Sequence, residues 1–424
     1  MSSAFSIALS SLQAESAAIN TTGNNLANMN TDGFKGSAVD FKDLFSASVG
    51  NGASSDSGLG VTLPVNNQLF TQGAIQTSSA PLSAAIQGNG FFVVNSPSNQ
   101  QLYTRDGNFV QNAAGELQTE TGEAVQGWTA GVNGISTTGA PGNIVLPADA
   151  VLPPTPTANF SINANMDSQG TAGVANTFSS PMQVVDSLGN THNLTMTFTQ
   201  NAAAPSTWNY NVSVSSADLT GGATGVNATQ VNLLANPGTV TFNTDGTLNA
   251  AATGTAPVAI NLNGLADGAA NMPMNWSLFN AAGTGQLTDY AQASGLASST
   301  QDGNTASSLT SVGIQNGGQV VATYSNGQTK VEAQLAMAAI QNPTSLQNVG
   351  NNNLAAGANT AIPAVGTPQT GGRGQVLGGA VESSNVDMAT EFTNLIVYQS
   401  AYQASSRVIS TEQTIDQDVL QLIH

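Results

Sequence analysis

Apolar side chains recur every seven residues near both ends of the chain. The N-terminal stripe consists of Phe5, Leu12, Ile19 and Leu26, with Ala8, Ser16 and Gly23 at the intermediate positions. A seven-residue apolar repeat predicts a helix with a narrow apolar face, as in coiled coils. Turn-forming residues from Asn28 to Gly33 then predict the end of this helix.

The C-terminal segment carries a stripe of similar character. It comprises Met388, Phe392, Leu395, Tyr402 and Ile409 and continues, shifted by one residue, with Val408, Ile415 and Leu422. Ser384 and Asp387 have the spacing of a capping pair that predicts the start of a helix. Each stripe alone is typical of the core face of an ordinary amphipathic helix. The occurrence of two such stripes, one poor in large residues, favours a bundle built from many copies of the chain.

The interior shows the two-residue alternation of β-strands. Leu194, Met196 and Phe198 form one alternating run, and the next consists of Trp208, Tyr210, Val212 and Val214. These two runs are predicted to pair as a hairpin across a loop that contains Pro205. Four dipeptides predict tight turns, because Asp or Asn before Gly accepts a positive φ: Asp106-Gly107, Asp245-Gly246, Asp302-Gly303 and Asn326-Gly327. The fold class predicted is mainly β, with interior antiparallel domains and helical termini paired as a coiled-coil-like domain.

A Pro-rich segment at 147–156 and a segment at 355–374 that is rich in Ala, Gly, Thr and Pro are interpreted as joints between domains. Their positions suggest a nested arrangement of domains. We expect a terminal helical polymerisation domain from 1–32 and 380–424. An inner β domain with linker segments is expected from 33–145 and 286–379. The remaining residues, 146–285, are predicted to form an inserted outer β domain.

Composition narrows the class of protein. Only 7% of the 424 residues are charged, against about 25% in an average soluble domain. Six scattered basic residues and a formal net charge of −18 argue against a nucleic acid partner, which needs clustered Lys and Arg. The absence of Cys excludes disulfides. No apolar run approaches the roughly 18 residues of a membrane span, and the first residues lack a signal-peptide pattern, so we expect no membrane insertion and no cleaved leader.

Candidate chemistry is sparse. The histidines are His192 and His424, too few for a zinc cluster or a His-based triad, and His192 is interpreted as solvated beside a turn. Glu120 and Glu123 could be imagined as a glycosidase pair, but a solvated loop is the favoured interpretation. We therefore predict no catalytic, cofactor-binding or metal-binding residues.

Several blocks resemble the flagellar rod and hook protein family. The family motif is matched by Asn24, Asn25, Ala27, Asn28, Thr31, Gly33, Phe34 and Lys35, by Gly88, Asn89 and Gly90, and by Ser384, Asn385, Val386 and Asp387. Ser400 departs from the family, in which many relatives carry a basic residue. The large middle, with blocks at 185–190, 324–329, 342–343 and 350–352, resembles the hook proteins of that family more than its shorter distal rod proteins.

The resemblance implies a structural subunit that polymerises with itself into a curved, flexible tube. This tube, a universal joint, would link the rod to the filament outside the cell and transmit torque. Implied partners are the distal rod protein, the hook cap, the hook–filament junction proteins and the flagellar type III export apparatus. The two apolar stripes would form the polymer interface. Alternatives are a distal rod or other axial protein, a secreted β-rich adhesin, and a glycan-active enzyme with carboxylates converging in a cleft.

Overall fold

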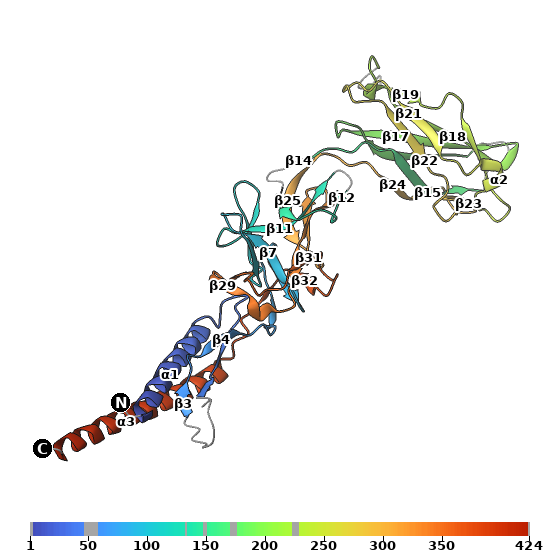
Figure 1. The fold of residues 1–424 in the computed structure, drawn as a ribbon. Coiled ribbons are helices and arrows are strands. Elements are labelled where there is room, and N and C mark those ends of the chain that lie inside the picture. Colours follow the sequence, from blue (N-terminus) through green and yellow to red (C-terminus); the bar gives the residue numbers. More distant parts are fainter. Residues whose placement is uncertain are drawn as a thin grey trace. The chain divides into compact units, whose positions relative to one another are not determined.

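The computed structural model describes residues 3–45, 58–131, 134–146, 151–169, 176–222 and 229–422. The chain divides into two compact units (Figure 1). The first comprises 1–148, 311–323 and 329–424, and the second comprises 149–310 and 324–328. The prediction of a mainly β protein with helical termini is confirmed.

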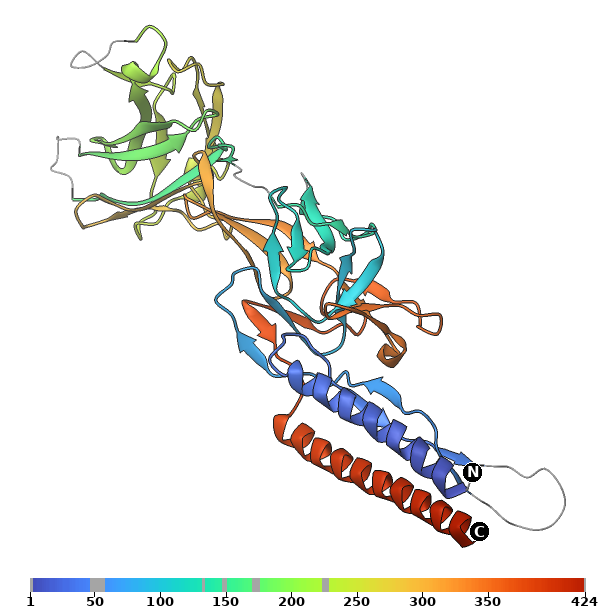
Figure 2. The ribbon, with the colours of Figure 1, turned by 90° about the vertical axis from the view of Figure 1, so that its left-hand side faces the viewer.

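Two long helices, α1 (Ser3–Ala27) and α3 (Met388–Leu422), pack against each other in the first unit. They run antiparallel, because Ser11 Oγ lies 2.9 Å from Ser405 Oγ and the Asn25 amide donates to Glu391 Oε1 at 3.0 Å. Figure 2 shows the start of α1 and the end of α3 at the same end of the pair. The predicted cap of α3 is wrong in detail: Asp387, and not Ser384, accepts the Thr390 amide, as an N-cap residue does.

Short strands connect α1 to the body of the first unit. Strand β1 (Ser37–Asp40) pairs with β4 (Val65–Gln68), and β2 (Asp43–Phe45) pairs with β3 (Gly58–Val61). Further on, β5 (Ile75–Thr77) pairs with β33 (Ala380–Glu382), and β6 (Ala84–Gln87) pairs with β32 (Gln375–Gly378). Segments from both halves of the chain are therefore held together by backbone hydrogen bonds before α3 begins.

The main sheet of the first unit has the strand order β26-β27-β11-β7-β8-β30-β29. Its strands are β26 (Gln319–Tyr324), β27 (Thr329–Leu335), β11 (Ala124–Gly131), β7 (Phe91–Asn95), β8 (Gln101–Thr104), β30 (Asn353–Ala355) and β29 (Gln347–Gly350). Smaller strands extend it: β9 (Phe109–Gln111), β10 (Leu117–Thr119), β12 (Gly134–Ile135), β13 (Gly142–Asn143), β28 (Met337–Ala339) and β31 (Ala364–Gly366). Asn326-Gly327 turns the chain between β26 and β27, with Gly327 at φ +79°, as its sequence predicts.

Both faces of strand β7 are buried. Phe92 and Val94 belong to one apolar cluster, and Phe91 and Val93 belong to the cluster on the opposite face. Because alternate side chains of a strand point to opposite faces, a strand covered on both sides carries a continuous apolar run. The two clusters stabilise the sheet from both faces, and the segments that lead to the helices are attached to it.

The second unit contains two five-stranded sheets. One holds β21 (Val258–Leu262), β22 (Met272–Trp276), β15 (Asn159–Asp167), β23 (Leu287–Tyr290) and β24 (Gly295–Gln301). The other holds β16 (Thr177–Val185), β17 (Thr191–Asn201), β18 (Ala204–Ser215), β19 (Gln230–Asn232) and β20 (Gly238–Thr241). Side chains from both sheets share one apolar core that includes Phe198, Trp208 and Trp276.

Pairing in this unit confirms one prediction and corrects two. The alternating runs form the antiparallel hairpin β17–β18, with Leu194 opposite Val214, although Pro205 lies inside β18 rather than in its loop. The predicted domain boundary at 285 is wrong, because β23 and β24 both pair with β15, and the unit extends to residue 310. The pairs of β15 with β22 and β23 are parallel.

The remaining strands lie where the chain passes between the units. These are β14 (Val151–Leu152) and β25 (Ser307–Ile314).

Candidate functional site

Small side chains hold α1 close to its neighbours. Ala8, Ala14 and Ala18 are at most 5% exposed, whereas every member of the predicted stripe, Phe5, Leu12, Ile19 and Leu26, is only half buried. Of the three intermediate positions, Ala8 is buried, whereas Ser16 and Gly23 are exposed. The most buried apolar side chains of α1 are therefore its alanines.

Helix α3 turns one seam toward α1 and leaves much apolar surface open. Leu395 and Ile409 of the predicted stripe are half buried. The other predicted residues are exposed, with exposed fractions of 45% for Met388, 45% for Phe392, 42% for Tyr402 and 49% for Ile415. The side chain of Leu422 lies outside the described residues. Periodicity missed Ile396 and Val397, which are 63% and 56% exposed. The structure thus packs the two helices together without burying either stripe.

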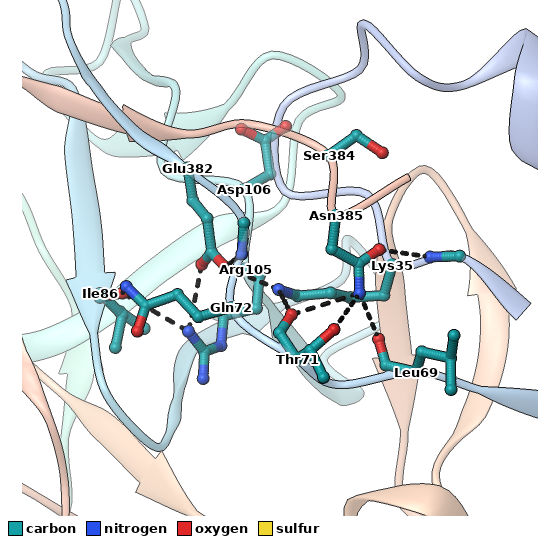
Figure 3. A network of polar contacts seen from close by, with 12 residues as sticks. Lys35, Leu69, Thr71, Gln72, Ile86, Arg105, Asp106, Glu382, Ser384 and Asn385 are labelled. Atoms are coloured by element: carbon teal, nitrogen blue, oxygen red, sulfur yellow. Dashed lines mark hydrogen bonds and ion pairs between the residues drawn. The ribbon is translucent and has the colours of Figure 1, made fainter. Parts of the chain in front are cut away.

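A buried ionic network lies where both termini leave the β body (Figure 3). Lys35 Nζ lies 2.6 Å from Glu382 Oε1 and donates to the Thr71 carbonyl at 2.7 Å. Arg105 Nη1 lies 3.1 Å from Glu382 Oε2, and Arg105 Nη2 donates to the Gly88 carbonyl at 2.8 Å. The side chains of Lys35, Arg105 and Glu382 are 2%, 6% and 0% exposed. One carboxylate is therefore shared by two buried cations, and the three residues come from distant parts of the sequence.

The environment shifts the pKa values around this network. Burial lowers the pKa of the Lys35 ammonium, an effect that Glu382 opposes and the like charge of Arg105 reinforces. Burial also lowers the pKa of Arg105, again against the attraction of Glu382. Beside them, burial raises the pKa of Asp106 to about 6, with a smaller contribution from Asp32. The arrangement has the features of a structural lock, because Lys35 and Arg105 each contact both Glu382 and a backbone carbonyl.

Two asparagines join the chain ends to this lock. The Asn385 amide accepts from the Gly36 backbone N–H at 2.8 Å and donates to the Leu69 carbonyl at 2.8 Å. The Asn25 amide exchanges two hydrogen bonds with the backbone of Ser37 and also reaches Glu391. Asn25, near the end of α1, is thus joined to the start of α3, and Asn385, just before α3, is joined to the segment that follows α1.

Gly33 permits a close approach between segments. It has φ +69°, and a Cβ there would lie 2.5 Å from the Asp106 backbone nitrogen, so a side chain is excluded. Its N–H donates to the Glu382 carbonyl at 2.6 Å. This glycine therefore places the α1 exit directly against the residue that anchors the ionic network.

The other motif residues lie around this junction. Asn28 bonds back to Asn24 and accepts from Thr31 at the end of α1, where Ala27 is the last helical residue. Phe34 is buried. Gly88 and Gly90 have positive φ, and the Asn89 carbonyl accepts from Gly374. Ser384 accepts the Val386 amide ahead of the cap residue Asp387. The structure therefore gathers most of the motif at one junction.

Sequence reasoning missed several of these residues. Arg105 and Glu382 were not predicted as site residues, because a lone charge carries no signal until its partner is known. Two interpretations as solvated residues are wrong: His192 is 7% exposed and Glu123 is 6% exposed. Glu123 accepts from the hydroxyls of Thr119 and Thr121, while Glu120 is exposed. No helix among the described residues combines the length and hydropathy needed to cross a membrane.

Four family models match the chain. They are the flagella basal body rod protein (5–35), the flagellar hook protein FlgE/F/G D1 domain (85–166), the flagellar basal body protein FlaE D2 domain (146–304) and the flagellar basal body rod FlgEFG protein C-terminal (377–422). A solved structure, flagellar hook protein FlgE2 of Helicobacter pylori, superposes on 66% of this chain and 93% of its own, with a TM-score of 0.47 and 14% identity.

Curated relatives match along almost the whole chain. The flagellar hook protein FlgE of Treponema pallidum is 30% identical over 98% of this chain and 98% of its own length. The flagellar hook protein FlgE of Escherichia coli is 31% identical over 97% and 98%. With matched domains at both ends and in the middle, the chain belongs to the flagellar hook protein family.

Proposed function

We propose that this chain, a structural subunit of the flagellar hook, polymerises through α1 and α3 into the curved, flexible tube that links the rod to the filament. The observation that carries the proposal is the uncovered apolar surface of α3. Burying a large apolar side chain fully contributes about 1.5–3 kcal/mol. A helix that leaves this much surface open gains stability when further helices cover it.

The exposed residues lie on two flanks of the seam that faces α1. At about 100° per residue, Met388, Phe392 and Ile396 fall on one side of α3. Val397, Val408 and Ile415 fall on the other side, and all six are at least 45% exposed. A single additional helix cannot cover both flanks. This geometry supports a bundle in which each α3 contacts helices of neighbouring subunits on both sides.

The buried lock suits a subunit that bears load. Backbone pairing and the Lys35–Glu382–Arg105 network tie both helix bases to one β body. Torque applied to the helix bundle would pass into the β body of each subunit through this junction. From membership of the family we also propose specific binding partners for the subunit: the distal rod protein, the hook cap, the hook–filament junction proteins and the type III export apparatus. We propose no catalytic role, and a distal rod or other axial protein is the second candidate.

Polymerisation of purified protein tests the proposal. Ile396→Glu places a charge on an uncovered flank, so the monomer should fold as the parent does while tube formation, seen by electron microscopy, is lost. Ser400→Glu is the matched control, because it adds the same charge at an exposed polar position of α3 that falls between the two flanks at about 100° per residue. Tubes formed by Ile396→Glu at parental yield would refute the interface. Loss of tubes in both variants would point to net charge instead of the apolar flank.

A further inference from the structure

A histidine surrounded by carboxylates lies in the second unit, whereas the terminal helices belong to the first. His192 is near the start of β17, Asp186 is in the turn before it, and Asp267 is in the loop between β21 and β22. A third carboxylate, Asp218, follows β18 in a short helix. By sequence, this unit contains eight Asp and no Lys or Arg. Three of those eight carboxylates therefore converge where no basic side chain other than His192 is present in the unit.

The imidazole faces two carboxylate oxygens with the same nitrogen. His192 Nε2 lies 3.1 Å from Asp186 Oδ2 and 3.5 Å from Asp267 Oδ2. One N–H cannot donate well to both oxygens. His192 Nδ1 is buried without a hydrogen bond and lies 3.4 Å from Asp218 Oδ2. The side chain is only 8% exposed, and its Nδ1 has no hydrogen-bond partner among the described residues.

We propose that Asp186, His192 and Asp267 bind one divalent transition-metal ion such as Zn²⁺. Ligand atoms about 2.1 Å from a tetrahedral zinc lie about 3.4 Å apart, which fits the 3.1 Å and 3.5 Å separations. The three ligand atoms lie within 4.8 Å of one another. One imidazole nitrogen with two carboxylates suits Zn²⁺ better than Ca²⁺, which takes six to eight oxygens.

The surroundings orient each ligand. Asp186 Oδ1 accepts the backbone N–H groups of Leu188 and Asn190, which leaves Oδ2 directed at the site. Asp267 Oδ1 accepts the Ala269 N–H. With metal on Nε2, the Nδ1 proton points to Asp218, as in carboxylate–histidine–metal arrangements. Asp218 is then a positioning residue, and the 26% exposed Asp267 side chain leaves a side open for water as the fourth ligand.

The site would link the two sheets of the second unit. Asp186 and His192 belong to the sheet that contains β16 and β17, whereas Asp267 belongs to the loop joining β21 and β22 of the other sheet. A metal that binds the folded unit raises its melting temperature by mass action. This role is separate from polymerisation through the helices, so it goes beyond the proposed function and does not depend on it.

Metal titration of the chelator-treated full chain tests the site. We expect one Zn²⁺ per chain by calorimetry, and a Co²⁺ absorption spectrum typical of four-coordinate geometry. Asp267→Asn and His192→Asn should each weaken Zn²⁺ binding at least about 10-fold, and Asp218→Asn about 10- to 100-fold. Asp267 lies in an exposed loop, so its variant keeps the test valid if His192→Asn fails to fold.

Two control variants test whether Zn²⁺ binds nonspecifically at other carboxylates or at the other histidine. Asp245→Asn changes an exposed carboxylate elsewhere in the same unit, and His424→Ala removes the chain's other histidine. Both should bind Zn²⁺ as the parent does. Absence of stoichiometric binding by the parent, or equal binding by Asp267→Asn, would overturn the proposal and leave His192 as a hydrogen-bond partner of Asp186.

Discussion

Neutralising Glu382 should destabilise the first unit far more than removing one of its cationic partners. The Glu382 carboxylate contacts Lys35 Nζ at 2.6 Å, Arg105 Nη1 at 3.1 Å and the Gly73 N–H at 2.9 Å. Glu382→Gln keeps the shape but leaves two buried cations without an anion. Breaking a buried pair by removing one partner costs about 3–5 kcal/mol.

The matched variant is Lys35→Met. It leaves Arg105 and Glu382 as a one-to-one pair, and the Thr71 carbonyl still accepts from Asn385 at 3.2 Å. We therefore expect a smaller loss, about 1–2 kcal/mol. For a unit of this size, about 2–4 °C per kcal/mol converts the Glu382→Gln cost to a fall of about 6–20 °C in melting temperature.

Hydrogen exchange in increasing urea, measured by mass spectrometry, separates the two units. Peptides from β7 and β11 report on the first unit, while peptides from β17 and β18 belong to the second and serve as the internal control. The reasoning fails if Glu382→Gln lowers the first unit's stability by less than about 1 kcal/mol, or if Lys35→Met costs as much. A change confined to the second unit would also contradict it.

Three further outcomes follow. Burial raises the pKa of Asp106 to about 6 from 3.8, so as the pH falls the folded state binds this proton before the unfolded state does, and the protein gains stability from about pH 6 down to pH 4. Asp106→Asn should therefore stabilise the folded protein at pH 7 by on the order of 1–3 kcal/mol and flatten that rise in urea titrations. A loss of stability at pH 7 would contradict this. We also predict that α1 and α3 become firmly folded only when subunits assemble, so in the free chain both helices should exchange amide hydrogens rapidly, since few large side chains cover them. Strong protection of both helices in the free chain would contradict this. A chain lacking 149–310, with its flanks rejoined, should still form tubes, because the helices and their junction lie in the first unit; failure under conditions where the parent polymerises would show that the second unit is required.

Local patterns predicted the elements well where one period dominated. The two-residue alternation gave the β17–β18 hairpin, and the seven-residue stripes gave both helices. Boundaries were less accurate. Strands β23 and β24 have little apolar alternation of their own, and only their pairing with β15 assigns them to the second unit.

By itself, the sequence determined the helical ends, the β interior and the blocks shared with the flagellar family, because periodicity and turn chemistry are local properties. Only the tertiary structure decided which charges meet. Lys35, Arg105 and Glu382 lie up to 347 positions apart, and no spacing rule links residues at such separations. The same holds for His192, whose neighbour Asp267 comes from the opposite sheet. A buried charge is costly unless it is paired, and its partner is set by strand pairing across the whole chain.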